Sequence, residues 1–264
     1  MITSRQNPRI KGVKKLWKRG EREAQDRFLI EGYRELTRAL HSAIVMETLL
    51  ISPELFLGSN EEALIEKWER RGATMIPCNG EVFRSVSYRD RPDGLLGVAK
   101  QHHFFLEDLP ASSNPFYVVA EAIEKPGNLG TILRSADAAH VDGVLVCDRC
   151  TDVHNPNVVR SSVGTLFTVP VVEEEGEVVW SWLKKKGVAI LAATPHADVL
   201  YTEVDLTGPI AIAVGTEQLG LSQKWMEGAD LQVKIPMLGV ADSLNVAMAT
   251  TLLLFEVVRQ RSGA

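Results

Sequence analysis

The sequence has 264 residues, of which 45% are hydrophobic and 24% charged, a composition typical of a folded globular protein that excludes a disordered or fibrous chain. The net charge of −5 is unevenly spread: residues 1–109 carry 18 basic and 16 acidic side chains, while residues 110–264 carry 11 and 18. Residues 1–19 hold seven basic side chains and no acidic one. Such a segment can bind the phosphate backbone of a nucleic acid, or it can form a helix face that is exposed to solvent.

Residues 1–106 alternate between helical and short apolar stretches, which predicts a small α/β domain over residues 1–108. Ile10, Val13 and Leu16 recur at helical spacing, so a helix over 10–20 can bury one side and expose its lysines. We also expect helices where apolar residues recur at helical spacing, and strands at short apolar runs. The expected helices are 32–43 and 61–72, and the expected strands are 28–32, 48–52, 74–78 and 94–100.

A polar linker rich in Pro, Ser and Asn follows at 107–115, and the alternation of strands and helices then restarts. The expected strands are 116–123, 143–148, 168–172, 188–194, 210–215 and 231–236. The expected helices are 129–140, 177–187, 222–229 and about 243–261, with a polar loop at 149–157. This order predicts a second domain, 115–264, with a largely parallel sheet covered on both faces.

Cysteine content and hydropathy indicate the compartment. Cys78, Cys147 and Cys150 are an odd number, which argues against a disulfide framework. Cys147 and Cys150 form a C-x-x-C, but no second pair stands at zinc-ligand spacing, so we interpret them as inert thiols. Because the chain has no apolar run of about 18 residues and no secretory signal, we expect a cytoplasmic protein that does not enter membranes.

The first segment with candidate functional residues is 124–137, which follows an expected strand. Pro126 and Gly127 break the strand, Asn128 is expected to cap the next helix, and Gly130 allows close approach of a ligand. Arg134 lies on an otherwise apolar helix, where an arginine is unfavourable unless it faces a cleft or an anion. The alternatives are a capped core helix and a nucleic-acid-binding KH loop, but the KH module has a helix, not a strand, before its GXXG.

The second segment, 215–222, is rich in glycine and follows the apolar stretch 210–215. It lacks the Lys-Ser/Thr of a phosphate loop, and no G-x-G-x-x-G follows an expected strand, which disfavours ATPases and dinucleotide-binding enzymes. Glu217 stands at the end of the strand, where ligands of parallel sheets bind. The alternative is a turn with an incidental acidic residue.

The third segment, 235–256, combines a turn with an apolar helix. Pro236 ends a strand, and Asp242 or Ser243 is expected to cap a helix that is apolar through Phe255. Such a helix is buried in the core or at a dimer interface. Asn245 is the polar exception and must be hydrogen-bonded if it is buried.

Together, these segments resemble the three signature motifs of the SpoU family of the SPOUT superfamily, the AdoMet-dependent RNA ribose 2'-O-methyltransferases. The matching residues are Asn128, Gly130 and Arg134 to Ala136 in the first motif, Gly215 to Glu217 and Gly220 in the second, and Ile235 to Met237 and Ser243 to Val246 in the third. The resemblance covers residues 116–261. Residues 1–106 resemble, through SRQNPRIKGVKKL and FLIEGYREL, the substrate-binding domain often fused in front, which has the fold of a small RNA-binding ribosomal protein.

The resemblance implies a deep trefoil knot at the C-terminal end of the chain, where S-adenosyl-L-methionine (AdoMet) is the cofactor and no metal is needed. It implies that backbone groups around Thr194, Gly215, Ile235 and Leu244 hold the adenosine, and that the chain forms a homodimer through the knotted region. Lys125 departs from the family pattern, since many members have an acidic residue before the proline of the first motif.

The implied reaction is 2'-O-methylation of a ribose in RNA, with 23S-type ribosomal RNA favoured over transfer RNA. Arg134 is expected to bind the phosphate beside the target ribose and to stabilise the developing alkoxide, because a guanidinium remains protonated at neutral pH. Asn128 would position Arg134 or the ribose, and Glu217 would orient Arg134 or the RNA. Ser243 and Asn245 would form the floor of the site. The rival hypotheses are a non-catalytic RNA-binding protein with the same fold and a metabolic α/β enzyme.

Overall fold

The computed structural model describes residues 1–263, and its internal contacts divide the chain into two compact units. Unit 1 consists of residues 1–102 and 152–168, and unit 2 consists of the remainder. The segment 152–168 therefore packs within unit 1, although it lies beyond the predicted linker in the sequence. None of the helices in residues 1–263 is long and apolar enough to cross a membrane.

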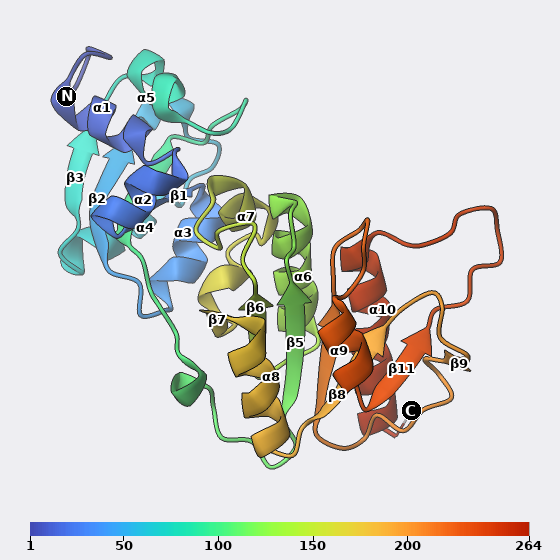
Figure 1. The fold of residues 1–264 in the computed structure, drawn as a ribbon. Helices are drawn as coiled ribbons and strands as arrows, with labels where there is room; N and C mark the ends of the chain where they lie inside the picture. Colours follow the sequence, from blue (N-terminus) through green and yellow to red (C-terminus); the bar gives the residue numbers. More distant parts are fainter. Residues whose placement is uncertain (264) are drawn as a thin grey trace. The chain divides into compact units, whose positions relative to one another are not determined.

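Unit 1 is built on a mixed sheet that, among the described residues, has four strands (Figure 1). The strands are β1 (Arg27–Glu31), β2 (Met46–Ile51), β3 (Thr74–Pro77) and β4 (Leu95–Lys100), in the order β1-β4-β2-β3. β4 pairs antiparallel with β1 and β2, and β2 pairs parallel with β3. All four coincide with predicted apolar stretches, and β1 and β4 bury nearly every side chain, as strands covered on both faces do.

Helices cover both faces of this sheet. They are α1 (Pro8–Lys15), α2 (Arg19–Gln25), α3 (Tyr33–Leu40), α4 (Glu61–Arg70), α5 (Gly80–Val86) and α7 (Pro156–Ser161), with short 3-10 turns at Pro53–Leu55 and Thr165–Phe167. α1 and α5 share a core with alternate strand residues such as Leu29 and Leu50, while α3 and α4 contact the sheet and each other. α2, α5 and α7 were not predicted. α2 buries only Arg22, so it has no apolar period to detect.

Unit 2 contains a parallel sheet that has seven strands within residues 103–263. They are β5 (Phe116–Glu121), β6 (Gly143–Cys147), β7 (Val171–Glu174), β8 (Ala189–Ala193), β9 (Val199–Leu200), β10 (Ile210–Val214) and β11 (Leu231–Lys234), in the order β7-β6-β5-β10-β8-β11-β9. The predicted parallel α/β sheet is confirmed. β7 begins at Val171, later than the expected 168, because a 3-10 turn and Pro170 precede it and proline has no N–H for the ladder.

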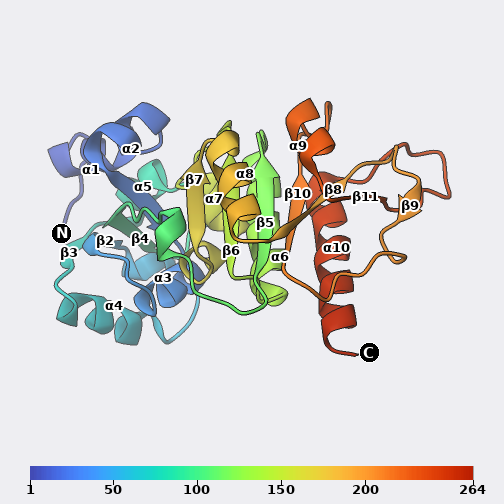
Figure 2. The same cartoon turned by 60° about the horizontal axis from the view of Figure 1, so that its bottom comes forward.

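Two pairs of helices cover the sheet of unit 2. They are α6 (Pro126–Ala138), α8 (Gly176–Lys185), α9 (Gln223–Gly228) and α10 (Val246–Arg261), and a 3-10 turn lies at Leu106–Asp108. α8 and α9 share one core with alternate residues of β5, β6, β8 and β10. α6 and α10 pack on each other and on β6 and β10, as the turned view also shows (Figure 2).

Two predicted helix starts in unit 2 are wrong. α6 begins at Pro126, and Asn128 is inside its first turn and does not cap it, because proline is favoured at the first helical position. α10 begins at Val246, and its cap is Asn245, whose side chain accepts from the Ala247 amide. Asp242 and Ser243 therefore belong to the preceding loop.

Candidate functional site

The first two motif segments meet because β5 and β10 are neighbours in the parallel sheet. Ala120 pairs with Val214 near the carboxyl ends of the two strands, so the loops that follow leave the sheet side by side. The buried Glu121 joins them, since its Oε2 accepts from the Ser222 amide at 2.7 Å. The loop after β10 is thus held against the end of β5.

Gly215 gives the loop after β10 its tight closure. A Cβ at this position would lie 2.1 Å from the Gly220 carbonyl oxygen, so no other residue fits. Thr216 and Gly220 exchange two backbone hydrogen bonds, each 3.0 Å long. Glu217 stands within the closed loop and is exposed, so its carboxylate is available to neighbouring loops.

All three motifs converge on the Glu217 carboxylate. Asn128 Nδ2 donates to Glu217 Oε1 at 2.8 Å, and Asn245 Nδ2 donates to the same oxygen at 2.7 Å. Asn245 Nδ2 also lies 3.1 Å from Asn128 Oδ1, and the Lys125 ammonium forms an ion pair with Glu217 Oε2. We call these four residues, Lys125, Asn128, Glu217 and Asn245, the Glu217 cluster.

The Glu217 cluster keeps its carboxylate ionised. The Lys125 ammonium, followed by the Asn128 amide, lowers the pKa of Glu217 below the ordinary value for a glutamate. A carboxylate in this state only accepts hydrogen bonds, so it orients the donor groups of Asn128 and Asn245. Lys125 was noted in the sequence only as a departure from the family pattern, and its ion pair with Glu217 could not be seen there.

Arg134 and Ser243 lie outside the Glu217 cluster. Arg134 is exposed on α6, six residues beyond Asn128, which corresponds to roughly 9 Å along the helix axis. Ser243 is exposed in the loop before α10. Neither side chain hydrogen-bonds another of the described residues, so both are open to an external ligand. The Ser135 and Thr251 hydroxyls, 2.6 Å apart, join α6 to α10.

The four residues predicted to hold the cofactor lie at or near the carboxyl ends of the strands. Thr194, Gly215 and Ile235 directly follow β8, β10 and β11, which are adjacent strands, and Leu244 stands just before α10. Thr194 and Ile235 are half-buried, and Leu244 is 37% exposed. Backbone groups at strand ends beside apolar side chains suit an adenosine, which combines a flat apolar ring with hydrogen-bonding edges. The residues present therefore fit the cofactor that the sequence predicts.

The sequence did not indicate Glu121 or Lys125 as contributors to this site. The only local sign of Glu121 is an acidic residue at the end of an otherwise apolar strand, a position at which burial calls for a hydrogen-bond partner. Its partner, Ser222, lies 101 residues away in the chain. Neither residue could be assigned a contact before the strand order was known.

Comparison with known proteins places the chain in a family. Residues 115–255 match the model of the SpoU rRNA Methylase family, and residues 7–97 match the MRM3-like substrate binding domain. A 23S rRNA (uridine(2479)-2'-O)-methyltransferase of Streptomyces viridochromogenes is 31% identical, covering 93% of this chain and 87% of its own. The 23S rRNA (guanosine(2553)-2'-O)-methyltransferase RlmP of Bacillus subtilis is 30% identical, covering 97% and 98%.

Solved structures agree with these matches over nearly the whole chain. A crystal structure of an RNA 2'-O ribose methyltransferase is 41% identical, covers 99% of both chains and has a TM-score of 0.88. The SpoU methyltransferase AviRb from Streptomyces viridochromogenes, in complex with AdoMet, is 29% identical, covers 98% of this chain and all of its own, and has a TM-score of 0.90. The family predicted from the three motifs is confirmed: this chain belongs to the SpoU rRNA methylase family.

Proposed function

We propose that this enzyme transfers the methyl group of AdoMet to the 2'-hydroxyl of a ribose in large-subunit ribosomal RNA. The observation that carries the proposal is the Glu217 cluster, in which two segments far apart in the sequence present oriented amides to the carboxylate of a third. The relatives named as 23S rRNA 2'-O-methyltransferases support the reaction and the RNA class. Transfer RNA is the alternative substrate class.

When AdoMet is bound, its sulfonium supplies the methyl group, and this chain aligns the ribose with it. Arg134, exposed and without a hydrogen-bond partner among residues 1–263, binds the phosphate beside the target ribose and stabilises the alkoxide that develops as the hydroxyl loses its proton. Asn128 and Glu217 position the ribose or the RNA backbone. Ser243 and Asn245 form the floor of the site. The residues that would hold the cofactor are Thr194, Gly215, Ile235 and Leu244.

The two parts of the chain have separate roles in this proposal. Residues 1–108 bind the RNA and have the fold of a small ribosomal protein, and residues 115–264 form the methyltransferase domain with a deep trefoil knot. A lysine stripe on α1 and the residues just after it supports RNA binding. Its members, at positions i, i+3, i+4 and i+7, are all exposed: Lys11, Lys14, Lys15 and Lys18. The match of residues 7–97 to a substrate-binding domain supports the role of the N-terminal part.

The active form is a homodimer that assembles through the knotted region, and it acts in the cytoplasm, where ribosomal RNA is modified. Support for the dimer comes from α10, whose Met248, Leu252 and Phe255 are 64%, 42% and 45% exposed. These positions, four and three residues apart, share one face of the helix. An apolar stripe of this kind is suited to a self-complementary interface.

The test is mass-spectrometric mapping of 2'-O-methylated nucleotides in ribosomal and transfer RNA from cells with and without the gene. We expect one ribosomal site to lose its methyl group in the deletion strain and to regain it with the wild-type gene. Arg134→Ala should not restore it, although the purified variant should bind AdoMet as the wild type does. Near-normal methylation by this variant would remove Arg134 from the mechanism.

The other outcomes of this experiment separate the rival functions. Loss of a methyl group from transfer RNA alone would establish the alternative substrate class. If no site changes and the purified protein does not bind AdoMet, the chain is a non-catalytic RNA-binding protein that keeps the family fold.

A further inference from the structure

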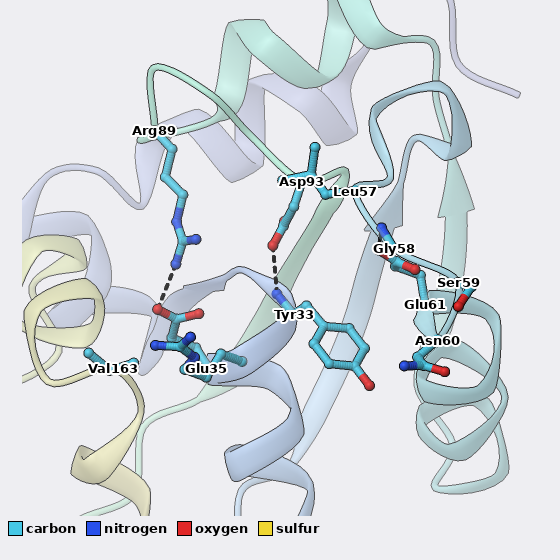
Figure 3. Close-up of a pocket in the computed structure, with 11 residues that line it drawn as sticks. Tyr33, Glu35, Leu57, Gly58, Ser59, Asn60, Glu61, Arg89, Asp93 and Val163 are labelled. Atoms are coloured by element: carbon cyan, nitrogen blue, oxygen red, sulfur yellow. Dashed lines mark hydrogen bonds and ion pairs between the residues drawn. The ribbon is translucent and has the colours of Figure 1, made fainter.

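Unit 1 contains a cavity of about 500 Å³ that the methyl-transfer site does not use (Figure 3). It lies between the first residues of α3 and the segment 57–61, which leads into α4. Ligand sites for small molecules span roughly 300–1,000 Å³, so the cavity has room for one nucleotide. Tyr33 and Asn60 are on its two sides, as the close-up shows.

Partly buried hydrogen bonds and an ion pair fix the walls of the cavity. Asp93 Oδ2 accepts from the Tyr33 amide at 2.7 Å, which anchors the start of α3. Arg89 Nη2 pairs with Glu35 Oε1 at 2.6 Å, and both residues line the cavity. On the opposite wall, the buried Glu61 accepts from the Gly58 amide at 2.8 Å. A cavity whose walls are already held needs little reordering to bind a ligand.

Several side chains at the rim, in contrast, leave their polar groups available. The side chains of Tyr33, Arg34, Ser59 and Asn60 make no hydrogen bond with the described residues, and the Asn60 side chain does not cap α4. Arg34, Ser59 and Asn60 are exposed, and Tyr33 is half-buried. The rim therefore offers an aromatic ring, a guanidinium, a hydroxyl and an amide to an external partner.

The charges of the lining select the class of ligand. The carboxylates of Glu35, Glu61 and Asp93 outnumber the guanidiniums of Arg34 and Arg89, so a simple anion is disfavoured inside the cavity. A nucleobase is neutral, stacks on aromatic side chains and is hydrogen-bonded at its edge by amides such as that of asparagine. Its phosphate would remain outside, within the reach of the exposed Arg34.

We propose that this cavity binds one unpaired nucleotide of the RNA substrate, with the base against Tyr33 and Asn60 and the phosphate at Arg34. The inference rests on the proposed function in that RNA is the ligand. It adds a recognition site in unit 1 for a single-stranded or bulged nucleotide. The lysine stripe on α1, in contrast, needs only a phosphate backbone.

The experiment measures binding of the full-length protein to fluorescent single strands of poly(A), poly(C) and poly(U) and to an RNA duplex of the same length. Tyr33→Leu, which keeps an apolar side chain but removes the ring, should weaken single-strand binding by roughly ten-fold, the scale of one base–aromatic stack. Tyr33→Phe should bind single strands as the wild type does. Duplex binding should be unchanged in both variants.

Two further variants keep the proposal testable if Tyr33→Leu does not fold. Arg34→Ala should weaken single-strand binding and reduce its dependence on salt by about one phosphate contact. The matched control is Arg70→Ala, an exposed arginine on α4 that does not line the cavity and should change neither quantity. Asn60→Ala should reduce the preference of the wild type among the three homopolymers.

Unchanged single-strand affinity in Tyr33→Leu, together with identical behaviour of Arg34→Ala and Arg70→Ala, would overturn the proposal. AdoMet binding and circular dichroism of each variant verify the fold. Because the assay contains no methyl transfer, its result is independent of whether a methylated nucleotide is found.

Discussion

Asn245 serves two neighbours with one side-chain amide. Its Oδ1 accepts from the Ala247 amide at 3.0 Å and caps α10, while its Nδ2 donates to Glu217. The residue therefore joins the stability of the final helix to the geometry of the Glu217 cluster. Aspartate, which has the same size, offers the acceptor for the cap but no donor for the carboxylate.

We predict that two substitutions at this position separate its two roles. Asn245→Ala should lower the free energy of unfolding by about 1 kcal/mol through loss of the cap, and it should reduce single-turnover methylation. Asn245→Asp should keep the cap and most of the stability, but it should reduce methylation at least as much, because its carboxylate repels Glu217 and cannot donate to it. Urea unfolding and single-turnover rates provide the measurements. Equal methylation by the wild type and Asn245→Asp would contradict the proposed role.

At the scale of elements, α10 has two apolar faces, one buried and one exposed. Leu253, Leu254 and Val257 are fully buried within unit 2. Met248, Leu252 and Phe255 form the exposed stripe on another side of the helix. A helix that packed only against the core of its own unit would have polar residues on its exposed side. The exposed apolar stripe therefore favours the proposed homodimer.

A charge within the stripe should prevent association. We predict that Leu252→Glu is monomeric, because a carboxylate buried in an apolar interface without a partner is strongly unfavourable. The matched control is Val178→Glu on α8, where the replaced side chain is also 42% exposed but lies outside the stripe. Sedimentation equilibrium of both variants and the wild type measures the change. If the wild type is itself monomeric at the concentrations at which it methylates RNA, the dimer proposal is wrong.

At the scale of the whole chain, a buried ion pair holds a distant segment within unit 1. Arg22 and Asp152 are 1% and 5% exposed and form an ion pair across 130 residues of sequence. The Arg22 guanidinium also donates to the carbonyls of Leu16 and Trp17 at 2.9 and 2.8 Å. α2 and the segment 152–168 are therefore joined by a charge pair that has little access to water.

Breaking this pair from one side should destabilise unit 1 far more than breaking a surface pair. We predict that Asp152→Ala lowers the free energy of unfolding by about 3–5 kcal/mol, because Arg22 remains buried and uncompensated. Glu66→Ala, which removes the exposed partner of Arg70, should change it by about 1 kcal/mol or less. Urea unfolding followed by circular dichroism compares them. The double substitution Arg22→Met with Asp152→Leu should recover most of the loss. A loss in Asp152→Ala no larger than in Glu66→Ala would show that the pair contributes little.

Much of the fold was predictable because its signals are local. The apolar stretches of unit 2 identified its strands except the two-residue β9, since strands of a covered parallel sheet bury nearly every side chain. Two of the three helices of unit 1 that escaped prediction have weak local signals. α2 is almost wholly polar, and α7 has only six residues. The start of α10 was misplaced because Asp242, Ser243 and Asn245 are all good capping residues, and only the tertiary structure selects among them.

The sequence by itself determined the family and indicated candidate residues for the site, because Asn128, Glu217 and Asn245 lie in motifs whose order and spacing can be read along the chain. The tertiary structure decided that these residues converge on one carboxylate, that Lys125 pairs with it and that Arg134 lies apart. It also decided that 152–168 packs within unit 1. The physical reason is that Asn128 donates to Glu217 across 89 residues and contacts Asn245 across 117. Contacts over such separations depend on the order of the strands in the sheet, which is a property of the whole fold and not of any local pattern of residues.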